Sequence, residues 1–291
     1  MHVLVTGGDG FIGRYLCTEL DERGHEITVL SRAPDDDVLP ARANTVSGDV
    51  TDPDTLEGAF EGVDVVVNLV ALSPLFIPSG GNEAHERIHL GGTENVVAAA
   101  EAAGVERLVQ MSALGADPEG STHYIRAKGR AEAVVRDSEM ATVIVRPSVV
   151  FGEGGEFVSF TKKLTPPLLA PLPGGGKTRF QPIWVNDLAP ILADCVAEEA
   201  RAGETYELGG PEQLTLKQIA KLVRGSVAVV PVPMVLAGVG LSIGGAIPGF
   251  PMGKDQYRSL RFDNTTADNA VTDFGVDPDD MLTLGAYLSR Q

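Results

Sequence analysis

The sequence predicts an α/β fold in which a parallel sheet carries helices on both faces and a smaller lobe follows it. Over the first 150 residues, short apolar runs alternate with segments of helical periodicity, which is typical of a doubly wound parallel sheet. A glycine-rich turn joins the first apolar run to the first helical segment. After about residue 150, loops rich in Gly and Pro interrupt the alternation. We therefore expect a core domain over residues 1–150 and a substrate lobe over most of residues 151–291.

The strands of the core are predicted where short apolar runs are bounded by turn residues. They are expected at residues 2–6, 27–31, 44–48, 63–70, 108–112 and 142–146. Between them, the spacing of apolar residues predicts helices at residues 11–23, 53–60, 83–103 and 123–137. Because crossovers between parallel strands are right-handed, this order places helices on both faces of the sheet.

The C-terminal half is predicted to return to the core in part. Residues 178–210 contain a short strand, a helix that begins near residue 186 and a further strand. The segment from Leu216 to Val223 is expected to form a helix that Thr215 caps. The remainder is predicted to form a lobe over the C-terminal ends of the strands.

One apolar segment needs a separate interpretation. Residues 225–253 carry no charge, and their prolines leave 14 uninterrupted residues, Met234 to Ile247. This is short for a membrane span, so we expect a buried or lid helix. Peripheral contact with one face of a membrane is the alternative.

Composition excludes several classes of protein. The chain has 23 basic and 40 acidic residues, a net charge of −17, and this argues against a nucleic-acid partner. Its 16 Arg against 7 Lys, within an acidic excess, resemble cytosolic proteins of salt-loving microbes. Two Cys and five His form no disulfide framework or metal-ligand pattern, so no metal site is expected. The first residues run directly into a strand, so we expect a cytoplasmic protein, with attachment to the inner face of the membrane left open.

The glycine-rich turn predicts a dinucleotide site. Gly7, Gly10 and Gly13 follow the first strand with the spacing G-x-x-G-x-x-G and open the first helix. Gly7 permits a tight turn, Gly10 lets the backbone approach a diphosphate, and Gly13 lets the helix lie close to the sheet. The free N–H groups at the start of the helix would face the phosphates.

The end of the second strand favours NADP(H) over NAD(H). NAD sites usually place an acidic residue here to bind the ribose 2′-hydroxyl, whereas this chain has Ser31 and Arg32. An arginine fork suits a 2′-phosphate, and Arg14 could add a second cation. Asp49, at the end of the third strand, is placed to accept a hydrogen bond from the adenine amino group.

A tyrosine and a lysine predict acid–base chemistry. Tyr124 and Lys128 stand four residues apart in a predicted helix, so both side chains face one crevice. A nearby ammonium is expected to lower the pKa of the phenol, so that Tyr124 exchanges a proton with a carbonyl or alcohol. Ser112 ends the preceding strand.

With these motifs in place, the sequence resembles the short-chain dehydrogenase/reductase superfamily, in its extended and atypical branches. The motifs that follow the family order are TGGDGFIG, GDVTD, NLVA, LGGTENVV, YIRAK, RPSVVFG and IWVNDLA. Within the superfamily the chain looks similar to the group of the nucleotide-binding accessory subunit of respiratory complex I. The segments that carry this likeness are SALGADPEGSTHYIRAKGRAE, FQPIWVNDLA, YELGGPE and PMGKDQYRSLRFDNT.

The resemblance implies a Rossmann-type core that binds a nicotinamide dinucleotide. Tyr124 would be the catalytic acid/base, with Lys128 and Ser112 beside it. The residues implied for the coenzyme site are Gly7, Asp9, Gly10, Phe11, Ile12, Gly13, Arg14, Ser31, Arg32, Asp49, Val50, Leu69, Val70, Ala71, Lys128 and Pro147. The expected activity is an NADP(H)-dependent oxidation or reduction of a small apolar carbonyl, alcohol or quinone-like molecule, in a pocket roofed by residues 227–247.

Two departures from the family pattern keep alternatives open. Ala113 stands where extended reductases usually carry a second hydroxyl, and His89 stands where they usually carry an Asn. The main alternative is a dinucleotide-binding accessory or sensor subunit, without turnover, of a respiratory NADH dehydrogenase complex. A third alternative is an epimerase or dehydratase acting on a nucleotide sugar. The sequence makes no prediction of the oligomeric state.

Overall fold

The computed structural model describes residues 1–238 and 253–291, and its core is a seven-stranded parallel sheet. The strands of this sheet are β1 (His2–Thr6), β2 (Glu26–Ser31), β3 (Asn44–Ser47), β4 (Val65–Asn68), β5 (Arg107–Met111), β6 (Ala141–Pro147) and β11 (Thr205–Leu208). They are ordered β11-β6-β5-β4-β1-β2-β3, and every pair is parallel. The predicted doubly wound sheet is therefore confirmed. Its order reverses beside β1, where a crevice forms at the carboxyl ends of the strands.

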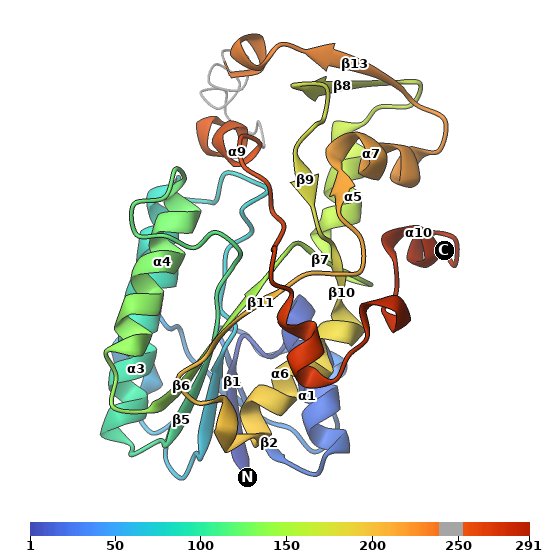
Figure 1. Ribbon diagram of the computed structural model, residues 1–291. Coiled ribbons are helices and arrows are strands. Elements are labelled where there is room, and N and C mark those ends of the chain that lie inside the picture. Colours follow the sequence, from blue (N-terminus) through green and yellow to red (C-terminus); the bar gives the residue numbers. More distant parts are fainter. Residues whose placement is uncertain (239–252) are drawn as a thin grey trace.

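Helices cover both faces of the sheet (Figure 1). They are α1 (Phe11–Glu22), α3 (Gly92–Ala102), α4 (His123–Arg136) and α6 (Val185–Ala197). The pair α1 and α6 packs on one face, and α3 and α4 pack on the other. Successive side chains of β1 point to opposite faces of the sheet. Val3 and Val5 therefore pack in the core under α1 and α6, whereas Leu4 packs in the core under α3.

The second lobe stands over the carboxyl ends of the strands (Figure 1). Its helices are α5 (Glu156–Leu164), α7 (Leu216–Arg224), α9 (Lys254–Ser259) and α10 (Leu284–Leu288). Its strands pair two by two as β7 (Val150–Phe151) with β10 (Ile183–Trp184), β9 (Arg179–Phe180) with β12 (Leu214–Thr215), and β8 (Leu169–Pro173) with β13 (Ala228–Val232). Thr215 opens α7 with the predicted cap, because its hydroxyl accepts from Gln218 N and the Gln218 side chain accepts from Thr215 N.

Two predicted helices differ in the structure. The long helix expected over residues 83–103 is divided into α2 (Glu83–His85), a wide π-helical turn (Glu86–Gly91) and α3. The start of α3 packs closely on Val50, since a Cβ on Gly92 would lie 2.8 Å from Val50 Cγ2. The helix expected at residues 53–60 is a short 3₁₀ turn, Pro53–Leu56, because Gly58 takes a φ of 75° and ends it.

The apolar segment is described up to Gly238: Ala228–Val232 form β13, and residues 234–238 are helical, at the start of the predicted lid helix. Most of the predicted lid helix, residues 239–247, lies outside the described residues. In the described ranges, 1–238 and 253–291, no helix has the length and apolarity that a bilayer crossing requires.

Candidate functional site

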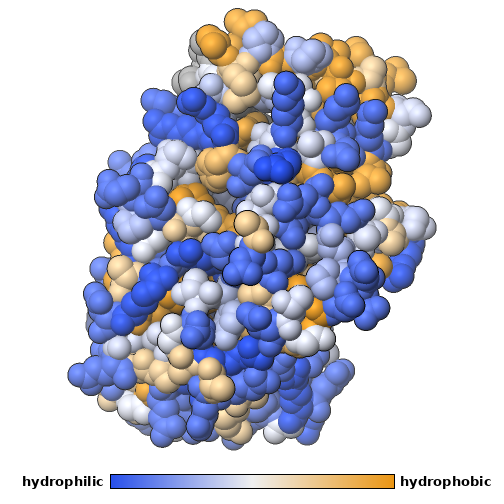
Figure 2. Space-filling view, viewed as in Figure 1, coloured by the Kyte–Doolittle hydropathy of each residue, from blue (hydrophilic) through white to orange (hydrophobic). Residues whose placement is uncertain are grey.

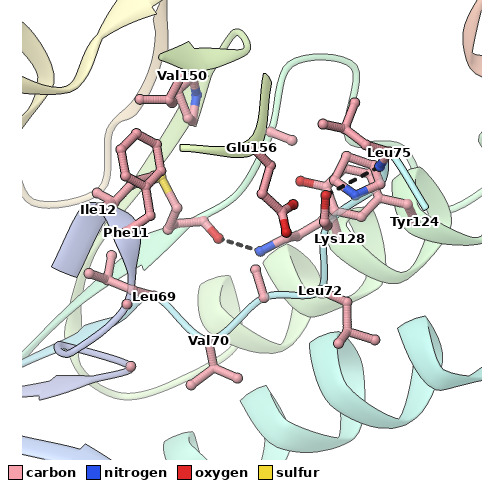
Figure 3. A pocket seen from close by; sticks show the side chains of 18 of the residues that line it. Phe11, Ile12, Leu69, Val70, Leu72, Leu75, Tyr124, Lys128, Val150 and Glu156 are labelled. Atoms are coloured by element: carbon pink, nitrogen blue, oxygen red, sulfur yellow. Dashed lines mark hydrogen bonds between the residues drawn. The ribbon is translucent and has the colours of Figure 1, made fainter. Parts of the chain in front are cut away.

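A cavity of about 1020 Å³ lies between the carboxyl edge of the sheet and the second lobe (Figure 3). It brings together the residues that the sequence assigned to the site, with the exception of Arg14. Those that line it are Gly7, Asp9, Gly10, Phe11, Ile12, Gly13, Ser31, Arg32, Asp49, Val50, Leu69, Val70, Ala71, Ser112, Tyr124, Lys128 and Pro147. Residues from six strand ends or turns and from two helices, α1 and α4, therefore share a single space.

The glycine turn forms a tight cradle at one side of the cavity. Gly7 has a φ of 71°, a conformation that favours glycine. A Cβ on Gly13 would lie 2.4 Å from the Gly7 carbonyl oxygen, so α1 can approach the turn this closely only with glycine there. Gly10 is the N-cap of α1 and supplies no side-chain hydrogen bond. The first N–H groups of α1 therefore keep their capacity to bind an anion.

A serine and a carboxylate meet at the end of β2. Ser31 Oγ donates to Asp9 Oδ2 at 2.7 Å. Arg32 is exposed beside them, and among the described residues it has no ion-pair partner. One cation and one anion thus stand together where the sequence placed the 2′-position of the adenosine ribose.

Arg14 lies away from this position. Its guanidinium donates to the Glu153 carbonyl and stands over the Tyr15 ring, 5.1 Å from the centroid. It links α1 to the loop at residues 153–154 of the second lobe. Arg14 therefore does not line the cavity beside Arg32, because it is held by a contact across 139 positions of sequence that no local pattern reveals.

Asp49 lines the cavity at the end of β3 in a fixed orientation. Its Oδ1 accepts from Thr51 N at 2.9 Å and from Thr51 Oγ1 at 2.8 Å. The backbone hydrogen bond first, and then the Thr51 hydroxyl and the nearby Arg32, hold the pKa of this carboxyl below its usual value. Asp49 is therefore an ionised acceptor facing the same space as Asp9.

Tyr124 and Lys128 come from one face of α4 and point into the cavity (Figure 3). Lys128 is 1% exposed, and its Nζ donates to the Met111 carbonyl at 2.7 Å. Burial lowers the pKa of Lys128 to about 8, against the attraction of Glu132. Burial also raises the pKa of Tyr124. The expected lowering of this pKa by Lys128 is therefore not found, because the ammonium is bonded to a carbonyl and desolvation of the phenol dominates.

Ser112 has a different partner from the one its position suggests. Its hydroxyl donates to Glu132 Oε1, a carboxylate on α4 that is 1% exposed. Arg146 from β6 also donates to Glu132, at 2.6 Å and 2.8 Å. Ser112 thus lines the cavity while its hydroxyl proton is committed to a buried charge network that joins β5, α4 and β6.

Two histidines beside Tyr124 were not predicted as site residues. The ring centroids of His85 and His89 lie 5.6 Å and 5.3 Å from that of Tyr124. Leu72 N donates to His89 Nε2 at 3.2 Å, and His85 Nδ1 lies 3.4 Å from the same atom. His89 Nε2 is therefore an acceptor, which assigns the proton of His85 to Nδ1 and leaves its Nε2 as an acceptor. Burial lowers both pKa values, that of His85 to about 4, so both rings are neutral near pH 7.

The second lobe supplies further lining residues that the sequence did not identify. Glu156 of α5 points into the cavity (Figure 3). Asp255 of α9 accepts from His123 N and Nδ1, both at 2.7 Å. Gln256 Nε2 donates to the carbonyls of Pro74 and Phe76. These contacts join segments more than 130 positions apart, so no local spacing could have predicted them.

A family model described as NAD(P)H-binding matches residues 7–167 of this sequence, more than half of the chain. The chain belongs to this NAD(P)H-binding family. Similar curated proteins include subunit 9 of the NADH dehydrogenase [ubiquinone] 1 alpha subcomplex of Arabidopsis thaliana, at 29% identity over 75% of this chain. They also include 2-alkyl-3-oxoalkanoate reductase of Stenotrophomonas maltophilia, at 30% identity over 75% of this chain and 73% of the reductase. The chain spans 56% of the Arabidopsis subunit, so it matches only part of that protein.

Solved structures of this fold agree with the topology. UDP-glucose 4-epimerase of Thermus thermophilus, in complex with NAD, superposes with a TM-score of 0.73 over 99% of this chain and 97% of the epimerase. Its sequence identity is 21%, so the likeness concerns the fold. The predicted membership of the short-chain dehydrogenase/reductase superfamily is confirmed by these findings together.

The residues of the cavity fit the coenzyme of the NAD(P)H-binding family. The uncapped start of α1 offers N–H donors to a diphosphate, and the Gly7–Gly13 contact leaves no room for a side chain that would block it. Asp49, Arg32 and Asp9 line the cavity at the ends of β2 and β3 and in the glycine turn, where the adenosine would lie, whereas Lys128 and Tyr124 line it from α4, where the nicotinamide would lie. The donor set therefore suits a dinucleotide that extends along the edge of the sheet.

Proposed function

We propose that this protein is an NADP(H)-dependent oxidoreductase that reduces an apolar carbonyl or quinone-like molecule. The observation that carries the proposal is the single cavity in which the glycine cradle of α1 and the Tyr124–Lys128 pair of α4 meet. The bound coenzyme would supply hydride. The other requirements, a proton donor and a binding surface for the substrate, fall to residues of this chain.

Tyr124 is suited to donate the proton. Burial raises its pKa, so the phenol is protonated near pH 7 and can give a proton to the oxygen of a carbonyl as negative charge develops there. Lys128, with a pKa of about 8, remains largely cationic at neutral pH and balances the phenolate that results. His85 and His89 hold the phenol ring from the side.

An apolar substrate is supported by the walls of the cavity. Leu72, Leu75, Phe157 and Phe180 line it, from both the core and the second lobe. One relative, 2-alkyl-3-oxoalkanoate reductase, has a name that describes a carbonyl compound with an alkyl chain. We extend this class of substrate, and not the individual compound, to the present chain.

A preference for NADP(H) is supported by Arg32. Its guanidinium is exposed at the end of β2 and lines the cavity, so it is available to a 2′-phosphate. Asp9 works against this preference from the adjacent position. We further propose that the protein works in the cytoplasm of a salt-adapted cell, on the basis of its 40 acidic residues and 7 lysines.

Removal of the Tyr124 hydroxyl tests the proposed activity. NADPH oxidation is followed with aliphatic ketones and with quinones, for the unchanged protein and for Tyr124→Phe. Loss of a general acid is expected to lower kcat by about 10²- to 10⁴-fold, with the Kd for NADPH unchanged. Equal rates for the two proteins would exclude Tyr124 as the proton donor.

A second candidate function, a dinucleotide-binding accessory subunit without turnover, is favoured by Ser112. Its hydroxyl is committed to Glu132, and Ala113 offers no replacement. The similarity to a subunit of NADH dehydrogenase supports the same candidate. This function predicts that NADPH binding is lost in Gly10→Val, is insensitive to Tyr124→Phe, and persists in a protein that co-purifies with a membrane complex. Turnover of any ketone or quinone would contradict it.

A further inference from the structure

The outer end of the second lobe carries an apolar ribbon, one face of which no other part of residues 1–238 and 253–291 covers. In the parallel pair β8–β13, Leu169 stands beside Ala228 and Pro171 beside Val230. The alternate residues Ala170 and Leu172 are buried against α7, in the cluster with Leu216 and Ala220. The ribbon therefore has one face in the lobe, and no described residue covers the other face, which contains Leu169 and Val230.

Apolar exposure is concentrated at this end of the molecule. In the part of the chain that the structure describes, seven large apolar side chains are exposed, and five belong to the ribbon or to the segments that flank it. We call these five the apolar tip: Leu168 (78% exposed), Leu169 (55%), Val230 (44%), Val235 (75%) and Leu236 (63%). Figure 2 shows apolar surface gathered at the same end, above the hydrophilic body.

The backbone at Leu168 adds a second observation. Leu168 has a φ of 78°, and it is the only non-glycine residue with positive φ among residues 1–238 and 253–291. A bulky side chain in this conformation is strained, and such strain often accompanies a functional position. The strained residue here is a leucine that is 78% exposed, so its side chain contributes little to packing within this chain.

The charge around the apolar tip is opposite to that of the rest of the protein. Residues 156–177 and 216–261 contain nine basic and two acidic residues, whereas the rest of the chain contains 14 basic and 38 acidic residues. Of the two acidic side chains, Asp255 is buried and paired with His123, and Glu156 faces the cavity. Six of the seven lysines fall in these two segments, which include the tip, and all six are exposed: Lys162, Lys163, Lys177, Lys217, Lys221 and Lys254.

We propose that the apolar tip and its lysines dock the protein on an anionic lipid bilayer. Leucine and valine side chains enter the boundary between headgroups and acyl chains, and the lysines contact the lipid phosphates. A protein partner is less well supported, because the cores of protein interfaces are enriched in aromatic residues and arginine, and the tip has neither. The net charge of −17 does not prevent docking, because salt screens charges beyond about 10 Å at 0.1 M ionic strength. At molar salt the screening length falls to about 3 Å, so there the apolar side chains would supply most of the binding.

The docking surface does not depend on the proposed oxidoreductase function. It is nevertheless consistent with an apolar substrate, because α5 and α9 contribute both to the basic region and to the cavity walls. A docked lobe would place the cavity near the bilayer, from which an apolar carbonyl or quinone could enter.

Flotation with vesicles tests the proposal on the full chain. Vesicles of phosphatidylcholine alone are compared with an equal mixture of phosphatidylcholine and phosphatidylglycerol, at about 0.1 M salt. We expect binding to the mixture only. The double variant Lys162→Gln/Lys163→Gln is expected to bind about 25-fold more weakly, since each basic residue near an anionic surface contributes about fivefold. Arg42→Gln/Arg290→Gln removes the same charge from exposed positions outside the basic region and is expected to bind like the unchanged protein.

The variant Leu168→Gly separates vesicle binding from folding. Leu168→Gly removes a side chain from the tip and relieves the strained backbone, so we expect weaker binding to vesicles with an unchanged or higher Tm. Retained NADPH binding would show that the coenzyme site is intact in each variant. The proposal is overturned if the protein binds neutral vesicles equally well, if neither Lys162→Gln/Lys163→Gln nor Leu168→Gly weakens flotation, or if the protein self-associates through the tip and does not float.

Discussion

At the scale of single residues, the cavity combines side chains that local structure orients with side chains that distant partners orient. Gly7, Gly13, Tyr124 and Lys128 have roles that follow from local spacing, because a turn and a helix fix their directions. The partner of Ser112 could not be read in the same way. Its hydroxyl direction depends on Glu132, 20 residues away, which a second strand must bring into place.

The opposed charges at the end of β2 predict how coenzyme choice responds to mutation. Arg32→Ala is expected to raise the Kd for NADPH by about tenfold or more, since a charged hydrogen bond contributes about 1.5–3 kcal/mol, and to leave the Kd for NADH nearly unchanged. Asp9→Asn keeps an acceptor for Ser31 but removes a negative charge beside the proposed phosphate, so NADPH is expected to bind several-fold more tightly. Fluorescence titration with both coenzymes measures these values. A parallel loss for NADPH and NADH in Arg32→Ala would contradict the assignment.

At the scale of elements, the sheet was predictable because its strands are buried runs between helices of regular period. The π-helical turn at Glu86–Gly91 could not be predicted. It lies where the chain packs tightly on Val50, and the spacing of apolar residues does not indicate such a contact. The joining of α9 to the core was equally hidden, since Asp255 and His123 are 132 residues apart. The features that could not be predicted from the sequence therefore depend on contacts between residues far apart in the chain.

The charge network of α4 predicts a large loss of stability when its centre is removed. Glu132 accepts from Ser112, Arg146 and Arg136 and is 1% exposed. Glu132→Ala would leave Arg146, whose side chain is 21% exposed, with only its longer ion pair to Glu207, so we expect the free energy of unfolding to fall by about 3–5 kcal/mol. Urea unfolding at pH 7 measures it. The control is Glu207→Gln, on a more exposed carboxylate of the same Arg146, which is expected to cost less than about 1 kcal/mol.

The same network predicts a direction of pH dependence. Burial opposes the charge of Glu132, but hydrogen bonds from Arg146 and Ser112 outweigh it and hold the pKa below its usual value. A lowered folded pKa means that the stabilisation is complete above the ordinary pKa of a glutamate and is lost as the pH falls through the folded value. The difference in stability between the unchanged protein and Glu132→Ala should therefore shrink on acidification. A constant difference would argue that packing, and not charge, anchors α4.

At the scale of the whole molecule, charge divides the protein into two regions. The basic residues around the apolar tip form one pole, and the strongly acidic remainder forms the other. Close to neutral pH the acidic surface repels itself and destabilises the compact state at low ionic strength. Among the described residues of the basic pole, Arg258 alone forms an ion pair, with Asp255, so the other basic residues remain available to an anionic surface.

This division predicts a stability that depends on salt. Screening by molar KCl is expected to relieve about 1–2 kcal/mol of repulsion and to raise the Tm by about 5 °C for a chain of this size. Differential scanning calorimetry over a range of KCl concentrations measures the change. Sucrose at matched osmolality is the control, because it favours the compact state without screening charge. A Tm that responds equally to sucrose and KCl, or to neither, would show that surface repulsion does not limit stability, and the proposed salt adaptation would lose its physical basis.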